Sequence, residues 1–258
     1  MRHLFKPFQW LYCLYAFLLF VICMFLVLPF VIIGSFFGSI RGGNFIYRVC
    51  HTWADVWIAL VGMHHWRVKE APYDETKQYV YVANHISYMD IPQIMKAVRK
   101  PFRVLGKEEM VKVPVFGFIY KSAVVTVDRT NPEKRSQSVR RLKAVLRSGI
   151  SIFIFPEGTF NMREDIPLKE FYDGAFRLAI ETQTPIKPLV FADTIDRMHF
   201  RSLLTLTPGK LRTIYLEEVP VAGLGMSDIP MLKEKVYRMM DASLRRCRQY
   251  QEPAPVAD

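Results

Sequence analysis

His85 and Asp90 are the two residues of this sequence whose types and spacing best suit acid–base chemistry. They lie five positions apart in the segment NHISYMD, directly after the apolar run at residues 79–83. An imidazole can take a proton from a hydroxyl near neutral pH, and a carboxylate bonded to one ring nitrogen orients the other for that transfer. The pair therefore predicts a general base, His85, held by Asp90. The usual role of Asn84 at this place is to cap the helix that follows.

Two other β-rich runs also end in polar residues. Val124–Val127 is followed by Asp128 and Arg129, and residues 150–155 run into the segment PEGT. In a parallel α/β sheet, the carboxyl ends of the strands lie at one edge, and ligands bind there. Three polar clusters at such ends therefore predict one shared site.

The elements that must position these residues alternate between short β-rich and helical runs after Trp66. This order predicts an α/β fold with a largely parallel mixed sheet, and apolar strands such as ISIFIF indicate that helices cover both faces. The expected strands are residues 79–83, 124–127, 150–155, 186–191 and 211–216, and the expected helices are residues 91–98, 132–147, 174–182 and 231–250.

The N-terminal region predicts a membrane anchor, because residues 7–40 contain no charged side chain. A helix over residues 10–38 would be about 44 Å long, against roughly 30 Å of bilayer hydrocarbon. Basic residues flank both ends, which favours a hairpin within one leaflet, broken near Pro29 and Gly34, over one tilted spanning helix. A second, amphipathic stretch follows at residues 44–66.

These observations divide the chain into membrane-anchoring helices at residues 1–66, an α/β domain at residues 67–250 and a disordered tail at residues 251–258. The flanking charges predict the cytoplasmic (cell inner) membrane, with the catalytic domain facing the cytoplasm. The four cysteines form no Cys-x-x-Cys pair, which fits a reducing compartment and gives no sign of a metal site.

The charge of the chain is strongly positive. The formal net charge is +11, and residues 96–147 contain fourteen Lys or Arg against four Asp or Glu. Such a surface attracts phosphate-bearing partners: anionic lipid, nucleic acid, or a phosphorylated substrate or carrier.

The motifs resemble those of the glycerolipid acyltransferases, typified by the 1-acylglycerol-3-phosphate acyltransferases. NHISYMD is similar to their Asn-His-x-x-x-x-Asp signature, residues 106–129 to their second motif, FPEGT at 155–159 to the third and PIKP at 185–188 to the fourth. The resemblance extends over about residues 50–220. It implies transfer of a fatty acyl chain from a thioester of acyl carrier protein or coenzyme A to the free hydroxyl of 1-acylglycerol-3-phosphate, a membrane lysolipid, giving phosphatidic acid. No cofactor, no metal and no nucleic-acid partner is then expected.

The resemblance also implies roles for individual residues. Lys107 is expected near the developing oxyanion and Arg129 at the substrate phosphate. Gly158 is expected to let the ligand approach the backbone, and Glu157 to orient a hydroxyl or a basic residue. The alkoxide attacks the thioester directly, which agrees with the absence of a Gly-x-Ser-x-Gly motif. The residues expected to bind substrate are Asn84, Arg129, Glu157, Gly158 and Thr159.

Two departures from the family pattern concern the head group of the acceptor. Phe160 and Asn161 follow Thr159, where the family often has Arg-Ser, and Asp173 stands where it often has lysine. Both changes remove positive charge, although Arg163 lies near enough to substitute. They favour, as the alternative acceptor, another lysolipid such as an amino-acid-containing one.

Two other classes of function remain open on the residues alone. A metal-dependent hydrolase could use His85, Asp90 and Glu157 as ligands. A membrane-tethered nucleic-acid binder could use the basic surface.

Overall fold

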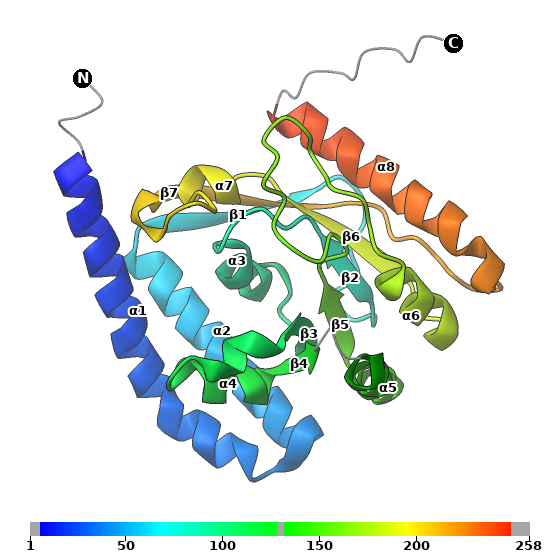
Figure 1. Cartoon of the computed structure of the whole chain (residues 1–258), viewed down its shortest axis with the longest axis horizontal. Coiled ribbons are helices and arrows are strands. Elements are labelled where there is room, and N and C mark those ends of the chain that lie inside the picture. The colour runs from blue at the N-terminus through cyan, green and yellow to red at the C-terminus, as the bar shows by residue number, and fades with distance from the viewer. Residues whose placement is uncertain (1–5, 128–131, 249–258) are drawn as a thin grey trace.

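The computed structural model describes residues 6–127 and 132–248. Within them, seven strands form one sheet in the order β1-β7-β6-β2-β5-β3-β4 (Figure 1). Neighbouring strands are parallel, except that β6 and β7 are antiparallel. The predicted α/β fold with a largely parallel mixed sheet is therefore confirmed. The strands are β1 Met63–Lys69, β2 Val80–Ala83, β3 Phe102–Lys107, β4 Val124–Val127, β5 Ser151–Ile154, β6 Ile186–Phe191 and β7 Gly209–Tyr215.

Helices cover both faces of this sheet, with α1 to α4 on one side and α5, α6 and α8 on the other (Figure 1). The α-helices are α1 Lys6–Ser35, α2 Gly43–Leu60, α3 Asp90–Ala97, α4 Phe116–Ala123, α5 Pro132–Arg147, α6 Gly174–Thr182, α7 Thr194–Arg197 and α8 Ile229–Arg248. A π-helix spans Gly38–Gly42, and 3-10 helices span Glu108–Lys112, Leu203–Thr205 and Met226–Asp228.

Strand β2, which leads into the NHISYMD segment, is buried on both faces. Val80 and Val82 join the core beneath α5, α6 and α8, whereas Tyr81 and Ala83 join the core beneath α2 and α3. Full burial of one valine side chain contributes about 1.5–3 kcal/mol. A shift of the strand register by one residue would exchange these two faces. Packing therefore fixes where β2 ends and where the NHISYMD segment with His85 begins.

The sequence missed two strands. The expected amphipathic stretch at 44–66 is wrong beyond Leu60, because Gly62 adopts φ +66° and turns the chain into β1. The division expected between residues 66 and 67 therefore falls inside this strand. Strand β3 was missed because it contains Arg103 and Lys107. The expected tail, residues 251–258, lies outside the described residues.

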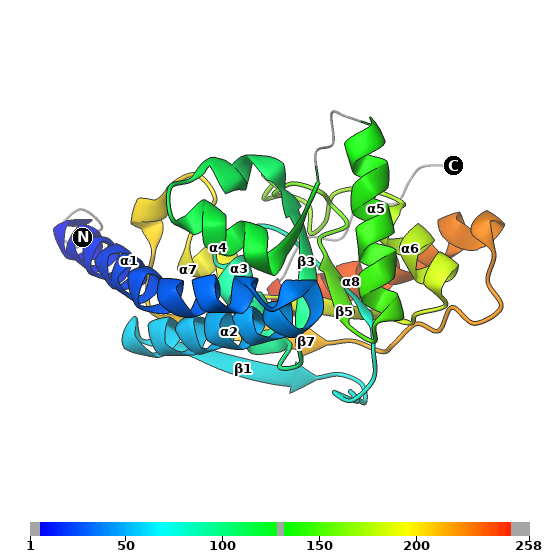
Figure 2. The same cartoon turned by 90° about the horizontal axis from the view of Figure 1, so that it is seen from below.

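The N-terminal helices form an antiparallel pair (Figure 2). Helix α1 is long and apolar enough to cross a membrane and continues unbroken through Pro29. The break predicted near Pro29 is therefore wrong, whereas the one predicted near Gly34 is confirmed, because α1 ends at Ser35 and the chain reverses ahead of α2. Gly34 and Gly42 let the two helices come close, because a Cβ on Gly42 would lie 2.1 Å from the carbonyl oxygen of Gly34.

A buried arginine joins this bend to the sheet. Arg103 in β3 is 5% exposed. Its guanidinium donates to the backbone carbonyl of Ser39 at 2.9 Å and to the Oδ1 atom of Asn44 at 3.1 Å. Desolvation lowers the pKa of Arg103. This pairing, formed between segments about sixty residues apart, explains how a charged residue fits inside a β-strand.

Candidate active site

The loop after β2 holds His85 against Asp90, the first residue of α3. The Nδ1 atom of His85 lies 2.8 Å from Oδ2 of Asp90. The same oxygen accepts the backbone N–H groups of Ile86 at 2.8 Å and Ser87 at 2.9 Å, and Asp90 is fully buried. The contact expected between His85 and Asp90 is therefore present. With Nδ1–H donating to the carboxylate, Nε2 is the ring atom left to accept a proton.

Aromatic rings surround the imidazole of His85. It stacks on Phe155 with ring centroids 3.8 Å apart, and the ring of Phe160 meets its edge at 4.4 Å. Tyr88 packs edge-on against Phe160 at 4.9 Å. The His85 side chain is only 16% exposed, so the base lies in a largely apolar setting that restricts access of water.

Glu157 links the loop after β5 to the loop after β2. Its Oε1 atom accepts the backbone N–H of His85 and its Oε2 atom that of Lys169, both at 2.8 Å. Burial raises the pKa of Glu157 to about 8, although both N–H groups oppose this shift. Glu157 thus joins the backbone of His85 to that of the basic residue Lys169. Its expected role in orienting a hydroxyl or a basic residue stays a prediction.

The other residues of the PEGT segment shape the same loop. Gly158 adopts φ +74°, a left-handed conformation that favours glycine. The Thr159 hydroxyl accepts a hydrogen bond from Nζ of Lys169 at 2.7 Å. Asn161, in the position where the family often has serine, donates its backbone N–H to the carbonyl of His85 at 2.7 Å. Both backbone groups of His85 are therefore bonded to this one loop.

Asn84 does not cap α3. Its Nδ2 donates to the backbone carbonyl of Phe191 at 3.0 Å, and its Oδ1 accepts the backbone N–H of Phe191 at 2.8 Å. The side chain is 2% exposed. Asn84 thus extends the pairing with β6 past the end of β2, and we assign it to positioning His85 instead of contacting substrate.

The structure describes only one of the two basic residues expected in the site. Lys107 ends β3, next to β5, with an exposed side chain at the carboxyl edge of the parallel strands. Its expected role at the oxyanion stays a prediction. Arg129 lies outside the described residues, so its expected contact with the substrate phosphate also stays a prediction.

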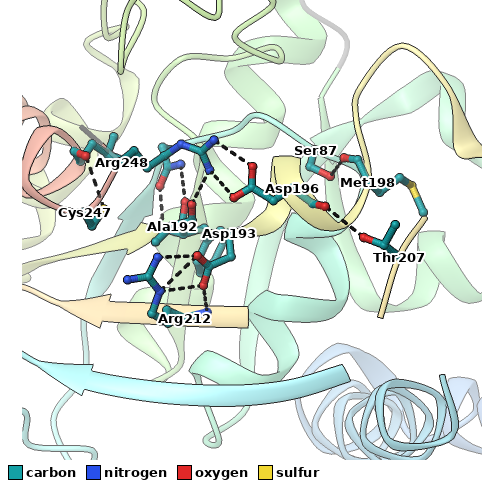
Figure 3. A network of polar contacts seen from close by, with 12 residues as sticks. Ser87, Ala192, Asp193, Asp196, Met198, Thr207, Arg212, Cys247 and Arg248 are labelled. Carbon is teal, nitrogen blue, oxygen red and sulfur yellow. Dashed lines mark hydrogen bonds and ion pairs between the residues drawn. The ribbon is translucent and has the colours of Figure 1, made fainter. Parts of the chain in front are cut away.

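Ser87 stabilises the turn between β2 and α3, and the sequence analysis did not identify it. Its hydroxyl donates to the backbone carbonyl of Met198 at 2.5 Å (Figure 3) and accepts the N–H of Met89 at 3.0 Å. Its own N–H bonds Asp90. The only signal in the sequence was a small polar residue inside the NHISYMD segment. Ser87 therefore connects the His85–Asp90 pair to the segment around α7.

Two arginines hold that segment in place (Figure 3). Arg248, at the end of α8, contacts both carboxylate oxygens of Asp196 at 3.0 Å. Arg212 in β7 makes a bidentate pair with Asp193, with contacts from 2.6 to 3.1 Å. Bidentate arginine–carboxylate pairs fix geometry as well as charge. Strand β7 and helix α8 thus fix the segment that supplies the acceptor for Ser87.

Residues 65–192, about half of the chain, match the family model described as Acyltransferase. Human 1-acyl-sn-glycerol-3-phosphate acyltransferase beta is 29% identical over 172 residues, which are 64% of this chain and 59% of that protein. The putative 1-acyl-sn-glycerol-3-phosphate acyltransferase acl-2 of Caenorhabditis elegans is 30% identical over 169 residues, again 64% and 59%. The 1-acyl-sn-glycerol-3-phosphate acyltransferase of Cocos nucifera is 34% identical over 117 residues, 45% and 37%. The chain thus matches less than two thirds of the length of these relatives.

The fold is also that of a solved structure. The crystal structure of PlsC, the 1-acyl-sn-glycerophosphate (LPA) acyltransferase of Thermotoga maritima, superposes with a TM-score of 0.71. The match covers 98% of this chain and 100% of that one at 22% identity. The dyad, the PEGT loop and β2, β3 and β5 all lie within the region that the family model matches. We conclude that residues 65–192 of this chain form an acyltransferase domain that is similar to those of the 1-acyl-sn-glycerol-3-phosphate acyltransferases.

Proposed function

We propose that this protein transfers a fatty acyl chain from an acyl thioester to the free hydroxyl of 1-acylglycerol-3-phosphate and so forms phosphatidic acid. The observation that carries the proposal is the 2.8 Å contact between His85 Nδ1 and Asp90 Oδ2, which leaves Nε2 as the basic atom. The relatives named above, which share the matched region, support the same reaction.

The chemistry requires no enzyme nucleophile. Nε2 of His85 takes the proton of the acceptor hydroxyl as its oxygen attacks the thioester carbonyl. The carbon–sulfur bond then breaks, and the imidazolium returns the proton to the departing thiolate, so that an ester and a thiol are formed. Asp90, held by two backbone N–H groups, stabilises the imidazolium. General base catalysis of this kind supplies about 10²–10⁴-fold, and Lys107 is proposed to stabilise the oxyanion.

The proposed place of the reaction is the surface of a membrane. Many large apolar side chains of α1 are exposed, and a patch of this size marks an interaction surface. Those exposed by half or more include Phe8, Trp10, Leu11, Leu14, Phe17, Leu18, Ile22, Phe25, Leu26, Phe30 and Ile33.

Helix α1 contacts the rest of the protein near both of its ends. The hydroxyl of Tyr12 donates to the carbonyl of Val61 at 2.7 Å, and Gly34 packs against Ile46. A spanning helix would carry these partners into the hydrocarbon with it. We therefore propose that α1 enters one leaflet with its exposed face toward lipid and that α2 joins it to the domain. The cytoplasmic face is proposed from the flanking basic residues.

The acyl donor is proposed to be a thioester of coenzyme A or of acyl carrier protein, both of which are anionic. Arg140, Arg141 and Arg147 are exposed on α5, which follows the predicted phosphate-binding Arg129 in the sequence. A positive surface there would raise the rate of encounter with either donor.

A second acceptor class keeps one supporting observation. Phe160, and not an arginine, follows Thr159 next to the base, which suits a lysolipid with a less anionic head group. The other departure gives no such support. The Asp173 carboxylate accepts a hydrogen bond from Lys233 of α8 at 2.8 Å, so it is engaged in packing α8.

One assay tests the proposal. The purified protein receives either 1-acylglycerol-3-phosphate or an amino-acid-containing lysolipid, with each donor in turn, and products are identified by mass. We expect the wild type to form phosphatidic acid and His85→Ala to form none. The control His64→Ala, which changes an exposed side chain on β1, should form it like the wild type. If neither donor yields phosphatidic acid, the proposal fails, and a product from the second acceptor alone identifies the alternative.

A further inference from the structure

One of the basic residues that the family often has near the head group of the acceptor is missing from this protein. At the position after Thr159, where the family often has arginine, Phe160 packs its ring against the edge of His85 and against Tyr88. An aromatic side chain in that position cannot pair with a phosphate.

Arg163, the nearest arginine in the loop, does not fill the place either. Its guanidinium binds the carboxylate of Asp165 through two hydrogen bonds, with Nε 3.2 Å from Oδ1. The side chains of both residues are more than 60% exposed. The charge of Arg163 is therefore neutralised within the loop and faces solvent.

Lys169 is a second basic residue of the same loop, and it contacts the PEGT segment next to His85. Its backbone N–H donates to Oε2 of Glu157, whose other oxygen accepts the N–H of His85. A single buried carboxylate thus separates the backbone of Lys169 from that of His85. The Nζ atom donates to the hydroxyl of Thr159 at 2.7 Å, one residue before Phe160. Both contacts of Lys169 therefore lie in the PEGT segment, which also bonds the backbone N–H of His85.

The ammonium of Lys169 keeps donors for a ligand. An ammonium carries three protons, and one of them goes to Thr159. Both oxygens of Glu157 accept backbone N–H groups, and among residues 6–127 and 132–248 no carboxylate forms an ion pair with Lys169. The side chain is half-buried, which strengthens its interaction with an anion relative to a fully hydrated lysine.

We propose that Lys169 binds the anionic head group of the acceptor and thereby takes the part of the arginine that Phe160 replaces. This inference rests on the proposed function, because the hydroxyl and the phosphate of 1-acylglycerol-3-phosphate are carried by adjacent carbon atoms. A cation that binds the phosphate must then lie beside the base. The tether through Glu157 places Lys169 there while Phe160 keeps the ring of His85 in an apolar setting.

Binding without donor tests the proposal, with calorimetry in detergent on the full chain. Lys169→Met and Lys169→Gln are expected to raise the Kd for lysophosphatidate about ten- to hundredfold, as for loss of a charge-assisted hydrogen bond. The Kd for 1-acylglycerol, which lacks the phosphate, should stay within about twofold. Lys169→Arg should retain most of the affinity, and the control Arg163→Met should leave both Kd values unchanged.

Two results would overturn the role of Lys169: an unchanged Kd for lysophosphatidate in both uncharged variants, or equal weakening for both ligands. Thermal unfolding of each variant identifies loss of the fold, and comparison with Lys169→Arg then tests the charge. Turnover of lysophosphatidate by the wild type is measured in parallel. If the wild type acylates lysophosphatidate while Lys169→Met binds it normally, only the role of Lys169 is refuted. If the wild type does not acylate it, the proposed function itself fails.

Discussion

Glu157 and His85 are joined through the backbone: the N–H of His85 donates to Oε1 of Glu157 at 2.8 Å, and the other oxygen of the acid accepts the backbone N–H of Lys169. The loop after β5 thus fixes the main chain of the base, while Asp90 fixes its ring. The two acidic residues, which belong to different sequence motifs, therefore have separate tasks: Glu157 sets the position of His85, and Asp90 sets its orientation and charge.

Asp90→Asn should lower kcat by roughly 10³- to 10⁴-fold, because a neutral amide neither fixes the tautomer of His85 nor stabilises its imidazolium. The amide oxygen can still accept the N–H groups of Ile86 and Ser87, so the fold should survive. Steady-state kinetics together with the melting temperature check this. A variant that retains more than a tenth of wild-type kcat would contradict the role of Asp90.

Glu157 should give stability a distinctive pH dependence. Its pKa is raised from 4.5 to about 8, so between these values the folded protein holds a proton that the unfolded chain has released. The free energy of unfolding should then fall as pH rises through this window, by up to about 1.4 kcal/mol per pH unit.

Glu157→Gln should remove that slope and also lower stability, because its amide NH₂ must face one of two backbone donors. Melting temperatures of both proteins in detergent from pH 5 to 9 make the comparison. Parallel curves would show that Glu157 does not titrate in this window.

Ser87→Ala should reduce kcat by roughly tenfold with a small change in KM, since the turn that presents Asp90 loses its bond to Met198. One neutral hydrogen bond contributes about 0.5–1.5 kcal/mol, which corresponds to that factor. Ser148→Ala is the matched control, because this exposed serine bonds only its own helix. Equal kcat values for the two variants would refute the positioning role of Ser87.

Membrane attachment should depend on the outer face of α1. Leu18 and Phe25 are exposed on it by 50% and 52%. A lysine costs about 2.5–3.5 kcal/mol in the centre of the hydrocarbon, so the double change Leu18→Lys and Phe25→Lys should release the protein from lipid vesicles in flotation. Met231→Lys, at an exposed site on α8, should not. Flotation of the double variant at the wild-type level would exclude α1 as the anchor.

The sequence predicted the central strands β2 and β5 because they are largely apolar runs that need no distant partner to be identified. It missed β3, because the charge of Arg103 is accommodated by carbonyl groups of the bend about sixty residues earlier. It predicted a helix cap at Asn84 from local spacing, whereas the side chain pairs with Phe191, 107 residues away.

The chemical centre of the site was easier to predict than its support. His85 and Asp90 are close in sequence and need only one turn to meet. The tasks of Glu157, Asn161 and Ser87 depend on backbone N–H and C=O groups. Every residue type carries those groups, so no sequence pattern marks the partner.

Gly34 and Gly42 have a practical consequence for genetic screens. Even one methyl group at Gly42 would collide with the preceding helix, so neither position tolerates a library of substitutions, although neither touches the chemistry. A selection scored by growth or product alone would rank both glycines beside His85. Only a parallel measurement of cellular protein abundance would separate substitutions that prevent folding from those that remove catalysis.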